Sequence, residues 1–274
     1  MLNMSKNYHF RRKSQSEFAN LLLSGCRTQE PWQMWSDFIT MTACAISNGF
    51  EQDNNRRNRR EELYLQTIQK YSKTERQIFP QLIASLANAL EREPEQDFLG
   101  EVFMGLSLFN HWKGQFFTPM DICRAMIKIE MCDLESQIRE ENWISLIDPA
   151  CGAGALLIAF RNELIIKGFG PETALFVGQD IDWTAALMSY IQLSLLGCPG
   201  YIVIGDTLSS PLAGKSASPL LIEVTPEQDI WVMPALYMTP WPERILFEKL
   251  SAFTSSRISR FILSSKVSLL SVLK

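Results

Sequence analysis

From residue 143 onward the sequence alternates short apolar runs with stretches of helical length. In chain order these segments are Trp143–Ile147, Ala155–Ile166, Ala174–Val177, Thr184–Leu195, Tyr201–Ile204, Asp229–Val232 and Pro242–Leu250. Alternating strand and helix signals are typical of βαβ units, whose strands form a largely parallel sheet. The pattern therefore predicts an α/β domain, and it constrains the fold more than any other feature of the chain.

The first hundred residues have a different pattern, because their apolar residues recur at helical spacing. Between Thr74 and Glu93 the apolar positions are three and four residues apart and share one face. The segment from Trp32 to Ser47 repeats this spacing. These patterns predict a helical domain over residues 1–112, followed by an α/β domain over residues 113–274.

Basic residues are concentrated near the N-terminus, although the chain as a whole is weakly acidic. Its 26 Lys and Arg residues are outnumbered by 30 Asp and Glu residues, which excludes a generally basic nucleic-acid-binding protein. The dense basic run is Asn54–Arg60, whose Arg56, Arg57, Arg59 and Arg60 are candidates for contacts with DNA phosphates. A solvated start of a helix explains the same run equally well, so both interpretations stay open.

Cysteine, histidine and apolar content bear on metal binding and location. The six cysteines form no C-x-x-C pair, which favours free thiols in a reducing compartment, and the two histidines leave no His-rich metal site. No apolar run approaches the roughly 18 residues of a membrane span, and the basic residues 11–13 lack the apolar segment of an export signal behind them. We therefore expect a cytoplasmic protein without a metal and without membrane contact.

The sharpest local signal is Asp148–Gly154, which follows a predicted strand and precedes a predicted helix. Gly152 and Gly154 allow a tight turn that approaches a ligand closely, and the next helix begins with the positive end of its dipole. The segment lacks the third glycine of a dinucleotide fingerprint and the Gly-Lys-Ser/Thr of a phosphate loop. An acid before the turn instead suits a ligand with a positive group, such as an amino acid moiety.

Two further acids follow predicted strands. Asp180 ends the second strand, and Asp206 comes just after the third. An acid in the position of Asp180 commonly accepts hydrogen bonds from ribose hydroxyls, and the next side chain, Ile181, can lie on an adenine ring. Each acid alone is better explained as a helix cap or a loop residue. Together, at one edge of a parallel sheet, Asp148, Asp180 and Asp206 predict a site for a nucleoside-type ligand.

Four motifs, taken in order, resemble the cofactor-binding motifs of adenine-N6 DNA methyltransferases. They are GQFFTP at 114–119, DPACGAG at 148–154, GQDID at 178–182 and GDTL at 205–208. The pattern is most similar to the modification subunits of type I restriction systems and their single-chain relatives, and it covers about residues 97–208. The resemblance implies a Rossmann-like methyltransferase sheet behind an N-terminal helical domain, with S-adenosylmethionine as the cofactor.

The resemblance also assigns roles to individual residues. Those expected to flank the methionine part of the cofactor are Phe117, Thr118 and Pro119. Those expected to line its amino acid portion are Asp148, Pro149, Ala150, Gly152 and Gly154. Asp180 would bind the ribose, Ile181 would pack on the adenine, and Asp206 would contact the adenine amino group. Cys151 lies within the turn and is expected to be structural, since this chemistry needs no protein nucleophile.

The chain departs from the family at its catalytic signature, which is Asn/Asp-Pro-Pro-Tyr/Phe after the fourth strand. In the family the polar side chain holds the target amine, and the aromatic ring stacks on the flipped base. Here the fourth predicted strand is followed by Met233–Trp241, and neither Asn-Pro-Pro nor Asp-Pro-Pro occurs. The remaining catalytic candidates are Pro234, Tyr237, Thr239, Pro240 and Trp241. Because few residues follow them, we also expect the sheet to be incomplete at its C-terminal end.

Functions of different classes follow from these observations. The first is methylation of adenine N6 in DNA by an S-adenosylmethionine-binding protein that acts with a partner. The alternative is a catalytically inactive methyltransferase-fold protein that serves as a DNA- or protein-binding regulatory module. Methylation of protein or RNA is a third interpretation. The expected partners are DNA and a specificity or partner subunit, and a second copy of the chain stays open.

Overall fold

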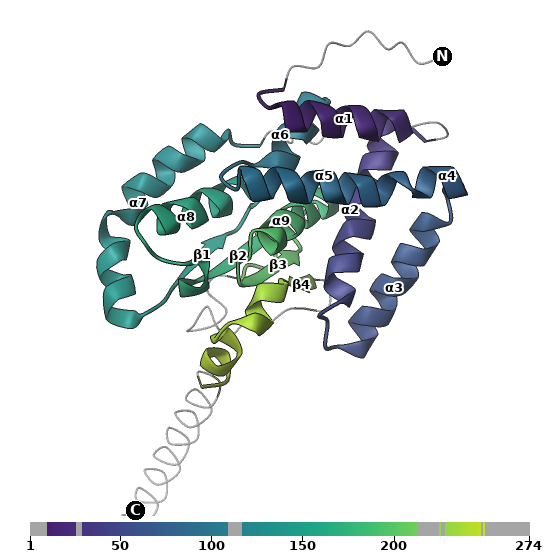
Figure 1. The fold of residues 1–274 in the computed structure, drawn as a ribbon. Helices are drawn as coiled ribbons and strands as arrows, with labels where there is room; N and C mark the ends of the chain where they lie inside the picture. Colours follow the sequence, from purple (N-terminus) through teal and green to yellow (C-terminus); the bar gives the residue numbers. More distant parts are fainter. Residues whose placement is uncertain are drawn as a thin grey trace, which may run out of the picture.

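A four-stranded sheet lies at the centre of the computed structural model, with helices packed around it (Figure 1). The structure describes residues 10–25, 29–108, 117–212, 225, 228–247 and 249. Across the sheet the strands follow their order in the chain, as β1 (Ile144–Asp148), β2 (Ala174–Asp180), β3 (Gly200–Ile204) and β4 (Asp229–Val232).

The first three strands are parallel, as the alternating pattern predicted, but β4 is antiparallel to β3. Ile204 is paired with Asp229 and Tyr201 with Val232, so β4 ends beside the start of β3. The N–H of Met233, the next residue, donates to the carbonyl of Gly200 at 2.9 Å. The chain therefore leaves β4 at the edge of the sheet where the parallel strands begin.

Helix α3 (Asn54–Ile68), from the N-terminal part of the chain, contacts β4, the outermost strand beside β3. The guanidinium of Arg60 donates to the carbonyl of Ile230, forms an ion pair with Asp229 at 3.4 Å and lies 3.8 Å over the ring of Trp231. This contact joins a helix near the start of the chain to a strand almost 170 residues later.

The described helices before residue 117 are α1 (Lys13–Gly25), α2 (Pro31–Asn48), α3, α4 (Lys73–Arg76), α5 (Ile78–Arg92) and α6 (Phe98–Gly105). The predicted helix at Trp32–Ser47 corresponds to α2. The one predicted at Thr74–Glu93 is divided into α4 and α5, and a capping box at Ser72 and Glu75 starts α4. The later elements are α7 (Met120–Glu141), α8 (Ala155–Ile166), α9 (Trp183–Leu195) and the short 3-10 helices η2 (Pro171–Thr173) and η3 (Pro234–Met238). None of the helices in the described part of the chain is both long and apolar enough to cross a membrane.

Two hydrophobic clusters lie on opposite faces of the sheet, because successive residues of a strand point to opposite sides. The larger cluster includes Phe176, Ile202 and Trp231 and extends through α8 and α9 into α1, α2, α5 and α6. The smaller cluster contains Leu175, Val177, Tyr201, Val203, Leu236 and Trp241. The N-terminal helices thus share one core with the sheet, and the domain boundary near residue 112 stays a prediction.

Candidate cofactor site

The three acids predicted at strand ends lie along one edge of the sheet. Asp148 is paired with Gly178, and Asp180, two residues beyond Gly178, is paired with Ile204. Asp206 follows two residues after Ile204, so the acids form a stepped row across β1, β2 and β3. Hydrogen bonds join the loops that leave these strands, from the N–H of Gly205 to the Asp180 carbonyl at 2.9 Å and from the hydroxyl of Thr207 to the Pro149 carbonyl at 2.5 Å.

The turn between β1 and α8 depends on two glycines in the left-handed region. Gly152 has φ +53° and Gly154 has φ +96°, values that residues with a Cβ rarely adopt. A Cβ on Gly154 would also lie 2.7 Å from the hydroxyl oxygen of Ser189 on α9. Gly154 is the N-cap of α8, so the turn presents the start of this helix at the carboxyl end of β1, where the dipole favours negative charge.

The carboxylate of Asp180 holds this turn from the neighbouring strand. It accepts hydrogen bonds from the N–H of Gly152 at 2.8 Å and from the N–H of Asp182 at 2.9 Å. Burial raises the pKa of Asp180, and these two hydrogen bonds oppose the rise. Burial also raises the pKa of Asp148, whose carboxylate accepts from the N–H of Ala150 at 3.1 Å. Two partly buried carboxylates, with few compensating charges, therefore line the same edge.

A cavity of about 230 Å³ lies beside the turn. Its described lining is formed by Phe117, Thr118, Cys123, Met126, Asp148, Ala150, Cys151, Gly152, Ala153, Ala155 and Leu156. The ring of Phe117 comes so close to Gly152 that a Cβ there would lie 3.0 Å from it. The structure thus brings the segment 117–118 and the glycine turn together, as the sequence predicted. Residues 114–116 of the same motif lie outside the described residues.

Pro119 lies next to this cavity rather than in its described lining. It precedes α7 as the N-cap and lines an adjoining cavity of about 390 Å³ together with Phe117 and Thr118. Cys123 and Met126, which line the first cavity from α7, were not predicted from the sequence. Helical spacing could have predicted them, because a helix that starts after Pro119 places residues three apart, such as Cys123 and Met126, on one face.

At the far end of the row the side chains are exposed. Ile181 is 71% exposed and Leu208 is 94% exposed. The carboxylate of Asp206 accepts from the N–H of Leu208 at 2.9 Å, and this bond holds the pKa of Asp206 below its usual value. Exposed apolar side chains next in sequence to, or two residues beyond, half-buried carboxylates are suited to a flat polar ring. Ile181 was predicted from the sequence, whereas Leu208 was not.

Cys151 lies in the turn as a buried thiol. Burial raises the pKa of its thiol well above the usual value, and the nearby carboxylates of Asp180 and Asp148 act in the same direction. The thiol therefore stays protonated at neutral pH, which fits a structural residue better than a nucleophile.

The structure does not bring the catalytic candidates Pro234, Tyr237, Thr239, Pro240 and Trp241 to this edge. They follow β4, and because β4 is antiparallel they lie at the opposite edge, where the parallel strands begin. The indole N–H of Trp241 donates to the carbonyl of Glu172, which precedes β2, and its ring packs against Trp143, which precedes β1. The direction of β4 thus separates these catalytic candidates from the candidate cofactor site.

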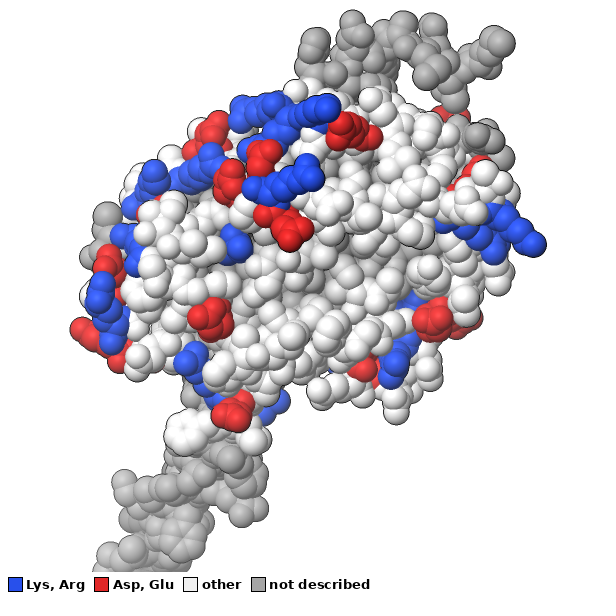
Figure 2. Space-filling model, in the orientation of Figure 1, with Lys and Arg blue, Asp and Glu red and all other residues white. Residues whose placement is uncertain are grey.

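The structure divides the DNA-binding candidates into two kinds. Arg60 is buried and pairs with the buried Glu51 at 2.8 Å, and Arg56 pairs with the same carboxylate at 3.0 Å. These two are not free for phosphates, because Glu51 would be left unpaired in a buried position. Arg57 and Arg59 are exposed. On the face shown in Figure 2 the Lys and Arg side chains of the described residues are interspersed with Asp and Glu.

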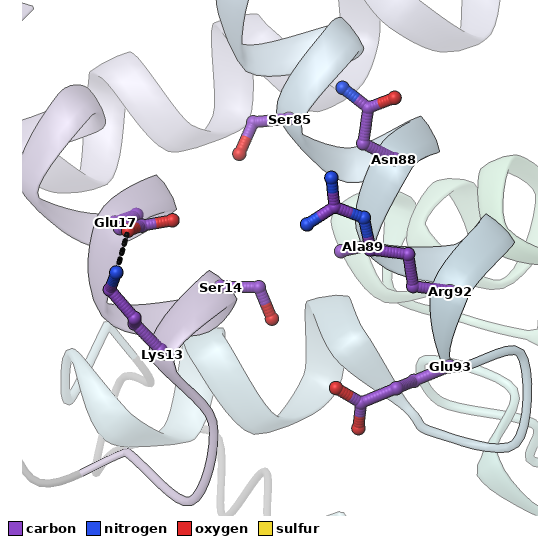
Figure 3. Close-up of a pocket in the computed structure, with 8 residues that line it drawn as sticks. All are labelled: Lys13, Ser14, Glu17, Ser85, Asn88, Ala89, Arg92 and Glu93. Atoms are coloured by element: carbon purple, nitrogen blue, oxygen red, sulfur yellow. Dashed lines mark ion pairs between the residues drawn. The ribbon is translucent and has the colours of Figure 1, made fainter.

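A further cavity, of about 440 Å³, lies between α1 and α5 (Figure 3). Its described lining comes from these two helices and the residue after α5, and includes Ser14, Asn88 and Arg92. Lys13 at its side pairs with Glu17 of the same helix at 3.3 Å. No strand end contributes to its described lining, so this cavity is separate from the candidate cofactor site.

Comparisons with known proteins define the family of the chain. The model of the family described as N-6 DNA Methylase matches residues 95–235, just over half of the sequence, so the chain belongs to this family. The methyl donor of such methylases is S-adenosylmethionine, which confirms the expected cofactor for the family. The sheet and the family together give the expected fold class, a Rossmann-like methyltransferase sheet preceded by helices.

Individual relatives match only part of the chain. The type I restriction enzyme MjaVII methylase subunit of Methanocaldococcus jannaschii is 28% identical over 126 residues, which are 43% of this chain and 20% of that protein. The chain thus spans about a fifth of the length of this curated relative.

Two solved structures are similar at a lower level. A class I S-adenosylmethionine-dependent methyltransferase of Listeria monocytogenes has 17% identity and a TM-score of 0.38, over 71% of this chain and 54% of that chain. The methyltransferase subunit of a type I restriction-modification system of Streptococcus thermophilus has 18% identity and a TM-score of 0.39, over 70% and 43%. At these TM-scores the likeness carries no argument of its own, and the fold class rests on the sheet and the family.

Proposed function

We propose that this chain binds S-adenosylmethionine at the carboxyl edge of its parallel strands and supplies the cofactor-binding part of an adenine-N6 DNA methyltransferase. The observation that carries the proposal is the cavity between Phe117 and the glycine turn at the end of β1. Both sides of this cavity belong to motifs of the family, and the turn has no room for a side chain at Gly154.

The groups at this edge fit the chemistry of the cofactor. S-adenosylmethionine carries an ammonium and a carboxylate at one end, a sulfonium in the middle and an adenosine at the other end. Asp148 would hold the ammonium, and the start of α8 would face the carboxylate. Asp180 keeps lone pairs on both carboxylate oxygens beyond the two hydrogen bonds it accepts, and these would receive ribose hydroxyls. Ile181 and Leu208 would lie against the adenine, beside the acceptor Asp206.

When bound, the cofactor supplies an electrophilic methyl group. The protein must place the target amine in line with it, and adenine N6 is a weak nucleophile because its lone pair is delocalised into the ring. We propose that a partner supplies the acceptor groups for this amine, since the family signature is missing from the sequence. The same partner would read the DNA sequence.

A second function, a regulatory module without catalysis, is favoured by the position of Tyr237 and Trp241. The aromatic rings expected to stack on a flipped base are held at the opposite edge of the sheet. In this version the cofactor site is retained and the chain acts by binding DNA or another protein.

Isothermal titration calorimetry with S-adenosylmethionine and S-adenosylhomocysteine tests the proposal. Saturable binding is expected, and Asp180→Ala should weaken it by about 1.5–3 kcal/mol, the typical loss for a hydrogen bond to a charged group. Glu62→Ala is the matched control, because this exposed acid of α3 contacts Gln66 of its own helix and should leave the affinity unchanged. Absence of heat at millimolar cofactor from a folded protein would refute the proposal.

A further inference from the structure

One buried side chain on α9 connects the N-terminal helices with the glycine turn. Gln192 is fully buried. Its amide nitrogen donates to the carboxylate of Asp97 at 2.8 Å and to the carbonyl of Ala153 at 2.9 Å. Its amide oxygen accepts from the N–H of Leu99 at 2.9 Å. The carboxamide therefore uses both of its N–H groups and its oxygen, and two of its three partners lie at the start of α6.

The partner in the turn is the peptide group between Ala153 and Gly154. Its carbonyl accepts from Gln192, and its N–H, on Gly154, donates to the carbonyl of Cys151 at 2.8 Å. Two residues earlier, the N–H of Gly152 donates to the carboxylate of Asp180. Because glycines permit many backbone conformations, a turn built on two of them needs such contacts to keep one shape. Gln192 supplies the contact to the Ala153 carbonyl.

The acceptor Asp97 orients the amide of Gln192 from the other side. Asp97 is the N-cap of α6 and also accepts from the N–H of Gly100 at 3.0 Å. Both bonds go to the same oxygen, Oδ1, of a buried carboxylate, and a hydrogen bond to a charged acceptor is stronger than one to a neutral acceptor, which favours the bond donated by Gln192. The amide orientation that serves Asp97 also points the second N–H at Ala153.

We propose that Gln192 is a positioning residue for the cofactor, which keeps the turn 151–154 in its ligand-receiving shape through the Ala153 carbonyl. The inference rests on the proposed function, since the turn lines the cavity assigned to the cofactor. It also gives the N-terminal helices a role in cofactor affinity, because α6 holds the amide in place.

Gln192→Met tests this role, since methionine has a similar volume but no hydrogen-bonding amide. The affinity for S-adenosylhomocysteine, measured by calorimetry on protein that is folded by circular dichroism, should fall by about fivefold or more. The matched control is Gln96→Met. Gln96 is also fully buried and donates to the carbonyls of Ala89 and Glu93, but it does not contact the turn. The Gln96→Met substitution should lower the midpoint of unfolding without changing the dissociation constant for S-adenosylhomocysteine.

Gln192→Glu adds a readout that a packing role would not change. The new carboxyl group can donate to Asp97 or Ala153 only when it is protonated. The affinity of the Gln192→Glu variant for S-adenosylhomocysteine, relative to that of the wild-type protein at each pH, should therefore recover severalfold between pH 8 and pH 5.5. The Gln192→Met variant should show no such recovery. The titratable groups around this position are Asp97 and Glu101 on α6, Cys123 on α7 and Cys151 in the turn. Because the new carboxyl group and Asp97 would titrate as a coupled pair, the recovery reports protonation of that pair, and Gln192→Met, which adds no titrating group, is the reference for it.

The outcomes separate the two claims. If the wild-type protein binds the cofactor and folded Gln192→Met binds it within twofold of the same affinity, the inference is overturned and the proposed function stands. If Gln192→Met does not fold, Gln192→Glu decides, and an affinity that follows the wild-type pH profile overturns the inference. A wild-type protein that binds no cofactor overturns both.

Discussion

At Gly154 the backbone conformation and the space around the Cα both require glycine. Its φ of +96° is strained for other residues, and the hydroxyl of Ser189 occupies the position near a Cβ. Gly154→Ala should lower the free energy of unfolding by about 2–3 kcal/mol. Gly168→Ala is the control, because Gly168 also has a positive φ, of +83°, but nothing lies within 4 Å of its Cβ position. This substitution should lower the free energy of unfolding by only about 1 kcal/mol. Urea unfolding measures both, and equal losses would contradict the proposed clash with Ser189.

Asp97 makes the stability of the fold depend on pH. Burial raises its pKa from 3.8 to about 6, against the hydrogen bonds from Gln192 and Gly100. Because the folded pKa lies above the unfolded one, the native state binds more protons between these values, and the contribution of Asp97 to stability decreases as pH rises through about 4 to 6. By pH 7 the lost stability amounts to about 3 kcal/mol.

Asp97→Asn should remove this pH dependence, since the carboxamide keeps an oxygen for Gly100 and Gln192 but carries no charge. The free energy of unfolding of the variant minus that of the wild-type protein should therefore increase from pH 4 to pH 7 in urea titrations. Glu62→Gln, at an exposed position, should show no such increase. A difference for Asp97→Asn that is equal at the two pH values would contradict the assigned cause.

The contact between α3 and β4 is the clearest link between distant elements. Removing the guanidinium of Arg60 would take one of two ion-pair partners from the buried Glu51 and would also remove the contacts with Asp229 and Ile230, so Arg60→Met should lower the free energy of unfolding by about 3–5 kcal/mol. Arg59→Met, on the exposed side of the same helix, should change it by less than about 0.5 kcal/mol. Chemical denaturation of the two variants checks this, and similar values for both would mean that Arg60 is not a structural link.

How far the sequence predicts each element depends on whether its signal is local. The helix α2 and the strands β1, β2 and β3 follow from apolar periodicity, and the glycine turn follows from residue types that only one backbone conformation explains. The direction of β4 does not follow from the sequence, because the apolar pattern of Asp229–Val232 fits a parallel and an antiparallel strand equally well. The position of β4 is instead fixed by Arg60, which is far away in the chain. The role of Arg60 itself was hidden, since a buried arginine and a phosphate-binding one look alike in a basic run.

For the whole molecule, the expected activity of the isolated protein is low. Loss of one preorganised hydrogen-bonding group typically costs roughly 10²–10³ in rate, and this chain lacks the family's acceptor for the target amine. Transfer of tritiated methyl groups to genomic DNA should therefore be near background for the protein alone and should rise when neighbouring gene products are added. Robust transfer by the protein alone, abolished by Asp148→Ala, would contradict the proposed need for a partner.

A crystal structure of the protein with S-adenosylhomocysteine tests whether the cofactor occupies the edge formed by β1, β2 and β3. We expect density with the amino acid portion between Phe117 and the turn 151–154, the ribose at Asp180 and the adenine against Ile181. Density elsewhere, for example in the cavity between α1 and α5, would contradict it.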